Sequence, residues 1–144
     1  MNPAGKMTRA VLADTGPLYA LADPSDQFHD RAHRDLEMIV SGNNPVLVVF
    51  PVLCEAHTLV LRRLGGKYAA GWLSEMLSGS LPLNPEAKDY LEAARGLRKY
   101  SDQPITLVDA LLAGLTLKLN LQVWTFDRHF VTMRTNVWRS TARD

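Results

Sequence analysis

The sequence has a single cysteine, Cys54, among 144 residues and no long apolar run free of charge. One thiol cannot form an internal disulfide, so the framework of a small secreted protein is excluded, and we expect Cys54 to be a small buried residue. A membrane-spanning helix needs about 20 mainly apolar residues, and residues 1–8 lack the apolar core of a signal peptide. These absences favour a cytoplasmic protein with no membrane segment.

An excess of charge of one sign is also missing, because 16 basic and 15 acidic residues leave a formal net charge of +1. A domain that depends on contacts to phosphates often carries a visibly basic balance. Any contact to nucleic acid must therefore come from locally placed basic residues, and each basic group is otherwise a solvated helix end. Three such groups occur along the chain: Arg62, Arg63 and Lys67; Arg95, Arg98 and Lys99; Arg128 and Arg134.

No internal repeat or low-complexity linker divides the chain, and its 47% apolar and 22% charged residues are typical of a globular domain. A chain of this length buries roughly two-thirds of the surface that its unfolded form exposes, so it needs no disulfide to fold. We expect one domain over residues 1–144. Residues 1–6, just before Met7, are expected to be a flexible extension or to precede the native start.

Short apolar runs alternate with longer segments of helical period, which predicts an α/β fold with a parallel sheet. The expected strands are 9–13, 46–50, 80–83, 121–126 and 136–139. The expected helices are 15–22, 26–40, 51–64, 67–77, 85–100 and 106–120, with a turn or short helix at 127–133.

Two of these elements carry a predicted burial pattern. The run at 46–50 is apolar at every position, which favours burial on both faces of the sheet. In the fifth expected helix, Ala87, Leu91, Ala94 and Leu97 form the expected apolar side.

Two acids come directly after apolar runs: Asp14 follows 11–13 and Asp127 follows 123–126. In an open α/β sheet, ligands bind beyond the carboxyl ends of the strands, so acids at those ends are candidate site residues. The alternative is that each acid only caps the turn or helix that follows it.

Two further acids lie in expected helices. Glu55 shares an apolar stripe with Val52 and Leu59, where a charged group needs an ion-pair partner, an exit to solvent or a bound cation. Asp109 stands three residues after Thr106, which is the spacing of a capping box. An acid in that first turn can also face the carboxyl edge of the sheet, so capping and a site role are compatible.

Four carboxylates without a neighbouring cysteine ligand suit a hard divalent cation such as Mg²⁺ or Mn²⁺, which oxygen atoms and water coordinate. Without a metal, the acids would repel one another. With a metal, bound water becomes a better nucleophile, and the ion stabilises charge on a phosphate. The residue pattern therefore suits metal-assisted chemistry at a phosphate group.

The same acids and their neighbours resemble the PIN domain, and most closely the VapC-type toxins of toxin–antitoxin pairs. The resemblance implies a three-layer α/β/α sandwich around a parallel sheet with strand order 3-2-1-4-5. The pieces that carry it span nearly the whole chain in the family's order: Asp14-Thr15-Gly16-Pro17-Leu18, then Glu55, then Val108-Asp109-Ala110, and Thr125-Phe126-Asp127-Arg128-His129-Phe130.

The resemblance also implies Mg²⁺ or Mn²⁺ as cofactor, RNA as substrate, an antitoxin as partner and frequent homodimers. Some relatives carry another acid three residues after the last one, where this chain has Phe130, so a second metal ion is not implied. Carried over residue by residue, the catalytic and metal-binding acids are Asp14, Glu55, Asp109 and Asp127, with supporting hydroxyls from Thr15, Thr106 and Thr125.

Other functions compete with this interpretation. Asp14-Thr15-Gly16 is also the triplet of aspartic proteases, but those enzymes pair two copies in β proteins, and this chain is rich in helices. Phosphatases with an aspartyl nucleophile after the first strand normally carry a second aspartate where this chain has Gly16. An RNA- or partner-binding module that kept the fold but does not cut is the rival function. The presence of all four acids argues against it.

The remaining residues of chemical interest have simpler explanations. His29 and His33 share a helix face, but the four histidines form no convincing zinc set, and surface or packing roles are expected. The tryptophans are expected to be core or interface aromatics, and they are Trp72, Trp124 and Trp138.

Overall fold

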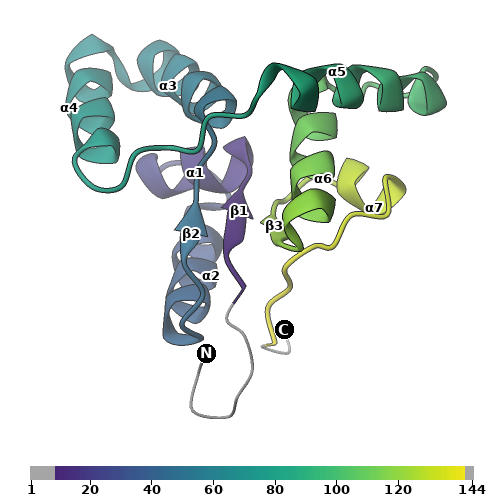
Figure 1. Cartoon of the computed structure of the whole chain (residues 1–144). Helices are drawn as coiled ribbons and strands as arrows, with labels where there is room; N and C mark the ends of the chain where they lie inside the picture. The colour runs from purple at the N-terminus through teal and green to yellow at the C-terminus, as the bar shows by residue number, and fades with distance from the viewer. Residues whose placement is uncertain (1–8, 142–144) are drawn as a thin grey trace.

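The computed structural model describes residues 9–141 and has a parallel sheet between two layers of helices (Figure 1). The central strand β1 (Val11–Ala13) pairs with β2 (Val46–Leu47) on one side and with β3 (Gln122–Trp124) on the other. All of these pairings are parallel, which confirms the predicted α/β class. The suggested extension, 1–6, lies outside the described residues.

Two isolated bridges extend the sheet at its edges. Leu83 pairs in parallel with Val49, next to β2, and Val137 pairs in parallel with Val123 of β3. The order of the five paired segments is therefore the predicted 3-2-1-4-5. The outer two are single bridges and not the strands expected at 80–83 and 136–139.

The sheet is paired beyond β2 by only one isolated bridge, and residues 46–50 are less buried than predicted. The pairing beside β2 consists of the hydrogen bonds of Leu83, whose N–H donates to the Val48 carbonyl and whose carbonyl accepts from the Phe50 N–H. Only Val49 is fully buried, whereas Val46 and Leu47 are partly exposed, so the expectation of burial on both faces was wrong for β2. Helix α3 also begins one residue earlier than expected, at Phe50.

The helices match the expected segments with small shifts. The predicted start at Asp26 was wrong, because the Asp26 carboxylate accepts a hydrogen bond from the Phe28 N–H and forms a turn before the helix begins at His29. The helices of the described residues are α1 (Thr15–Ala22), α2 (His29–Ser41), α3 (Phe50–Leu64), α4 (Gly66–Leu77), α5 (Ala87–Gly96), α6 (Leu107–Leu119) and α7 (His129–Thr132), with a 3₁₀ turn at Leu97–Tyr100.

Local chemistry ends two of these helices. Gly65 has a φ of 91° between α3 and α4, a left-handed conformation that costs glycine little. Asn120 adopts a φ of 53° after α6, and asparagine tolerates this region better than most residues. Each turn reverses the chain so that the next element packs back on the fold.

The sheet is buried on both faces because its side chains alternate. Leu12 and Val123 point into one core, formed mainly with α3 and α6, while Val11 and Trp124 point into a second core with α1 and α2. Trp124 is buried, as expected for a core aromatic, and its indole N–H donates to Asp35. These two cores fix β1 and β3, and with them the acids that follow.

Two burial predictions were wrong. On α5, Leu91 is 58% exposed, because Tyr90, Ala93 and Leu97 form the side that packs on the core. Asp89 is also buried and forms an ion pair with Lys118 of α6. Cys54 is exposed on α3, on the side opposite the buried Val52.

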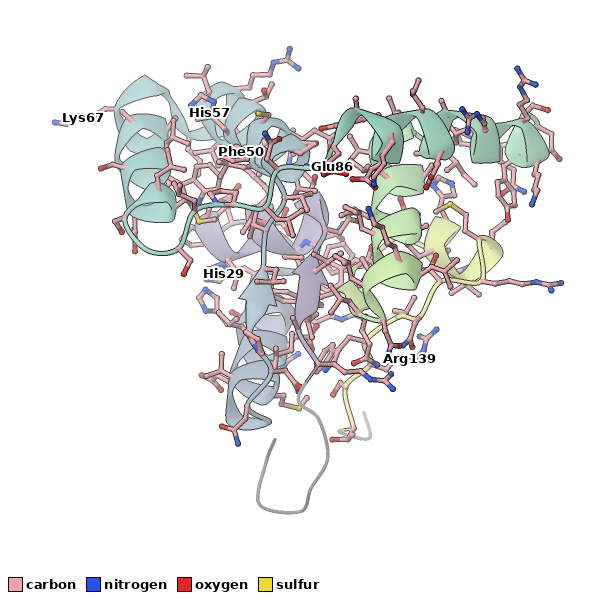
Figure 2. All side chains as sticks on the ribbon, in the orientation of Figure 1. His29, Phe50, His57, Lys67, Glu86 and Arg139 are labelled. Carbon is pink, nitrogen blue, oxygen red and sulfur yellow. The ribbon has the colours of Figure 1, made fainter. Side chains whose placement is uncertain are left out.

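The basic groups mostly behave as solvated helix ends. Lys67 projects away from the body of the molecule at the beginning of α4 (Figure 2). His29 and His57 lie well apart in the same view, whereas the ring centroids of His29 and His33 are 4.4 Å apart on α2. Of the basic residues singled out above, Arg128 lines the cavity described below. Within residues 9–141, no helix is long and apolar enough to cross a membrane.

Candidate metal centre

The four candidate acids line one open cavity of about 640 Å³. Asp14 follows β1 and Asp127 comes shortly after β3, while Glu55 belongs to α3 and Asp109 to the first turn of α6. In Figure 1 the arrows of β1 and β2 point toward the end of the molecule where α3 begins. The structure thus brings four separate segments to the carboxyl edge of the sheet. The role of these acids as metal ligands stays a prediction.

Asp14 is buried and held from two sides. Its carboxylate accepts a hydrogen bond from the Thr15 N–H at 2.8 Å, which caps α1, and another from the Thr125 hydroxyl at 2.8 Å. Burial raises the pKa of Asp14 to about 6. The hydrogen bonds from Thr125 and Thr15 lower this pKa, while the charges of Asp109 and Asp127 raise it further. The capping interpretation holds for Asp14, but the cap sits inside the acidic cavity.

Glu55 of α3 accepts a hydrogen bond from a residue of α1. The Thr15 hydroxyl donates to the Glu55 carboxylate at 2.8 Å, joining two residues that are 40 positions apart. Glu55 is exposed, so the expectation that it sits within the apolar stripe of α3 was wrong. It lies beside that stripe, whose buried members are Val52 and Ala56. The charge therefore needs no partner for stability, and its hydrogen bond to Thr15 places it at the cavity.

Asp109 is buried and forms the predicted capping box. Its N–H donates to the Thr106 hydroxyl at 3.1 Å, and its carboxylate accepts from the Thr106 N–H at 3.1 Å. The cap fixes Asp109 at the beginning of α6, where it lines the cavity with Asp14. The structural and the site interpretations are therefore both compatible with this geometry.

Asp127, which comes shortly after β3, has a side chain that is 39% exposed. Its N–H donates to the Thr125 hydroxyl at 2.9 Å, so the same hydroxyl links it to Asp14. The Asp127 carboxylate accepts from the His129 N–H at 2.9 Å, which forms the turn before α7. All three predicted supporting threonines thus contact a candidate acid, although their functional role stays a prediction.

Sequence reasoning assigned His129 to packing or the surface and missed its place in the cavity. The Nδ1 atom of His129 lies 3.2 Å from Asp127 Oδ1 and 3.7 Å from Asp109 Oδ2. The available signal was the spacing Asp127-Arg128-His129, because a residue two positions after an acid at a strand end still belongs to the same turn.

The donor set fits a divalent cation. Four carboxylate side chains offer the oxygen ligands that Mg²⁺ and Mn²⁺ accept. Ligand atoms of Asp109, Asp127 and His129 lie within 4.8 Å of one another. The Nδ1 atom of His129 is buried and has no hydrogen-bond partner among the described residues. The charges of Asp109 and Asp127 raise the pKa of Asp14, and a cation bound between these acids would relieve the repulsion.

The raised pKa of Asp14 predicts a pH dependence of stability without metal. The folded protein keeps this proton up to about pH 6, whereas the unfolded chain releases it near 3.8. Folding stability in EDTA should therefore fall as pH rises from about 4 to about 6, by about 3 kcal/mol from this group. Urea unfolding across that range measures the slope.

Asp14→Asn is the control that isolates this group, because it should remove the slope. Hydrogen bonds from Tyr19 and from Lys118 lower the pKa of Asp23 and of Asp89, respectively. Their contribution is lost only as pH falls below 3.8, outside the range tested. Equal slopes in wild type and variant would contradict the effect of burial on Asp14.

Comparisons with known proteins agree on the fold. The PIN domain family model matches residues 11–135. VapC20 from Mycobacterium tuberculosis, described as a toxin that cleaves the sarcin–ricin loop, is 24% identical with a TM-score of 0.77, covering 91% of this chain and 100% of that one. A search of curated proteins found no match.

Two further solved structures also contain a similar chain. VapBC2 from Rickettsia felis, bound to a DNA fragment from its promoter, gives 19% identity and a TM-score of 0.68, covering 90% of this chain and 97% of that one. FitAcB from Neisseria gonorrhoeae gives 22% identity and a TM-score of 0.64, with 90% and 96% covered. At these identities the likeness shows the fold, and the family model covers most of the sequence. The chain belongs to the PIN domain family.

Proposed function

We propose that the chain is a metal-dependent endoribonuclease that hydrolyses RNA phosphodiester bonds. The observation that carries the proposal is the convergence of four carboxylates from β1, α3, α6 and the segment after β3 in one open cavity. The similarity to VapC20, a toxin described as cleaving the sarcin–ricin loop, supports RNA as the substrate class. Asp14, Glu55, Asp109 and Asp127 are the proposed catalytic and metal-binding residues.

The chain's own residues would hold the reactants in a fixed arrangement. A bound Mg²⁺ or Mn²⁺ would supply Lewis-acid stabilisation of phosphate charge and a more acidic water. Thr15 and Thr125 donate to the carboxylates of Glu55 and Asp14, which limits their rotation before substrate binds. Arg128 lines the same cavity and offers a positive charge for an RNA phosphate. In this arrangement the four acids would face the reacting phosphate, and Arg128 would neutralise a phosphate of the RNA backbone.

The same relatives support a proposal for the biological setting. VapBC2 and FitAcB are complexes that contain chains with this fold. We propose that this protein is likewise the toxin of a toxin–antitoxin pair in the cytoplasm, that an antitoxin binds it, and that it forms homodimers. Growth arrest on expression, relieved by co-expression of the product of a small adjacent gene, tests this partnership. Size-exclusion chromatography with light scattering tests the dimer.

A labelled RNA incubated with the purified protein tests cleavage directly. Cleavage should require Mg²⁺ or Mn²⁺, stop in EDTA and resume when excess metal is restored. EDTA removes the cation that would stabilise charge on the phosphate and activate water. Asp109→Asn should remove activity, while Asp102→Asn, which changes an exposed acid away from the cavity, should keep it. Cleavage that persists in EDTA would contradict the proposal. RNA binding without cleavage under any metal would support the rival binding module.

A further inference from the structure

The imidazole of His129 occupies an unusual position for a group with only a structural role. It belongs to the first residue of α7, and its side chain is 27% exposed overall. Its Nδ1 atom, however, is buried in the acidic cavity and makes no hydrogen bond to any described residue. Buried polar atoms are normally hydrogen-bonded, so an unsatisfied one at a site calls for a partner.

The neighbouring carboxylates lie close to Nδ1 without forming a hydrogen bond to it. Asp127 Oδ1 lies 3.2 Å from Nδ1 and accepts from the backbone N–H of His129. Asp109 Oδ2 lies 3.7 Å away and accepts from the Thr106 N–H in the capping box. Both contacts are proximity without a directed N–H···O bond.

The two distances from Nδ1 lie in the range found between ligands that share one ion. In an octahedral shell with ligands at about 2.1 Å, adjacent ligand atoms are about 3 Å apart and opposite ones about 4.2 Å apart. The Nδ1 distances of 3.2 and 3.7 Å fall between these values. Ligand atoms of all three residues lie within 4.8 Å of one another. Each carboxylate is also held by a backbone hydrogen bond, so the three ligand positions are largely preformed.

We propose that His129 supplies a nitrogen ligand to the cation bound by Asp109 and Asp127, and that this ligand makes the site prefer Mn²⁺ over Mg²⁺. The inference rests on the proposed metal-dependent function and specifies the ion. Mg²⁺ takes oxygen ligands and retains water, whereas first-row transition metals also bind imidazole well. A mixed oxygen and nitrogen site therefore gains more for Mn²⁺ than for Mg²⁺.

The direct test is electron paramagnetic resonance of Mn²⁺ bound to the wild-type protein. Pulsed measurements detect the magnetic coupling of a directly bound ¹⁴N nucleus, and this signature needs no variant and no catalytic activity. The coupling should be present in wild type and absent in His129→Ala. His33→Ala is the matched control, because it removes an exposed imidazole of α2 that lies outside the cavity.

Metal titrations by calorimetry test the selectivity. His129→Ala should weaken Mn²⁺ binding by at least about tenfold, since even second-shell losses cost about that much. Mg²⁺ binding should change by less than about threefold. If the imidazole only offset the charge of the acids, its removal would change both metals alike, which would overturn the selectivity. His129→Gln, with the same titration and a melting curve in EDTA, serves if the alanine variant fails to fold.

The failures of the two proposals are distinguishable. Mn²⁺ binding without ¹⁴N coupling in wild type, and lost in Asp109→Asn, would overturn the role of His129 and leave the metal-dependent function intact. A wild-type protein that binds neither Mn²⁺ nor Mg²⁺ would overturn both.

Discussion

Asp14→Asn is expected to lower RNA cleavage by at least about a thousandfold, equivalent to about 4 kcal/mol of activation free energy. The same substitution should stabilise the metal-free protein at neutral pH by as much as about 3 kcal/mol. The loss of activity and the gain of stability have one cause, the negative charge of Asp14. Burial and the charges of Asp109 and Asp127 make this charge unfavourable in the metal-free protein, whereas a bound cation would be attracted by it.

The asparagine can keep the local hydrogen bonds. Its side-chain oxygen can accept from the Thr15 N–H as the carboxylate does, and its amide N–H can donate to the Thr125 hydroxyl oxygen. Cleavage of a labelled RNA, urea unfolding in EDTA and metal titration on one preparation measure the three effects. Asp102→Asn is the matched control, because it makes the same chemical change at an exposed position. A variant that loses activity but is less stable in EDTA would indicate a mainly structural Asp14.

The pattern of apolar runs was sufficient to predict the sheet. β1 is fully buried because helices cover both faces, and its three residues form an uninterrupted apolar sequence that periodicity analysis detects. Asp14 follows from the same reasoning, since its position depends only on where β1 ends. The edges of the sheet were less predictable, because the bridges at Leu83 and Val137 depend on how far each segment follows its neighbour.

Helix faces were harder to predict because tertiary contacts override the apolar pattern. Leu91 belongs to an apolar series on α5, yet Tyr90, Ala93 and Leu97 form the side that packs on the core, so Leu91 faces solvent. Sequence periodicity gives the existence of an apolar face, but it does not decide between two overlapping apolar faces of one helix. The same limit explains why Cys54 proved to be exposed.

The candidate site shows what depends on three-dimensional contacts. Asp109 could be placed from the capping box, which is a local spacing rule that the structure confirms. The spacing from Asp127 could have placed His129 in the same turn, but its proximity to Asp109, 20 positions earlier in the chain, is a contact that only the structure shows. The hydrogen bond between Thr15 and Glu55 is likewise invisible in the sequence, since it joins α1 to α3.

Glu55→Gln is expected to separate function from stability most cleanly. The residue is exposed, so neutralising it should change the free energy of unfolding in EDTA by no more than about 0.5 kcal/mol. The Thr15 hydroxyl can still donate to the glutamine side-chain oxygen, so the geometry between α1 and α3 is kept. Cleavage of a labelled RNA should nevertheless fall by about a thousandfold, because the site loses one of four negative charges that bind the metal.

Glu75→Gln provides the matched control, since Glu75 is an exposed acid of α4 that lies outside the cavity. It should keep wild-type cleavage, stability and metal affinity. RNA affinity, measured without metal at fixed salt, should be nearly the same in all three proteins, because Arg128 and not Glu55 contacts phosphate in the proposed complex. Glu55 is exposed and so has no structural need of a partner. Wild-type cleavage by Glu55→Gln would therefore make it an ordinary surface acid and reduce the metal centre to the three acids near β1, β3 and α6.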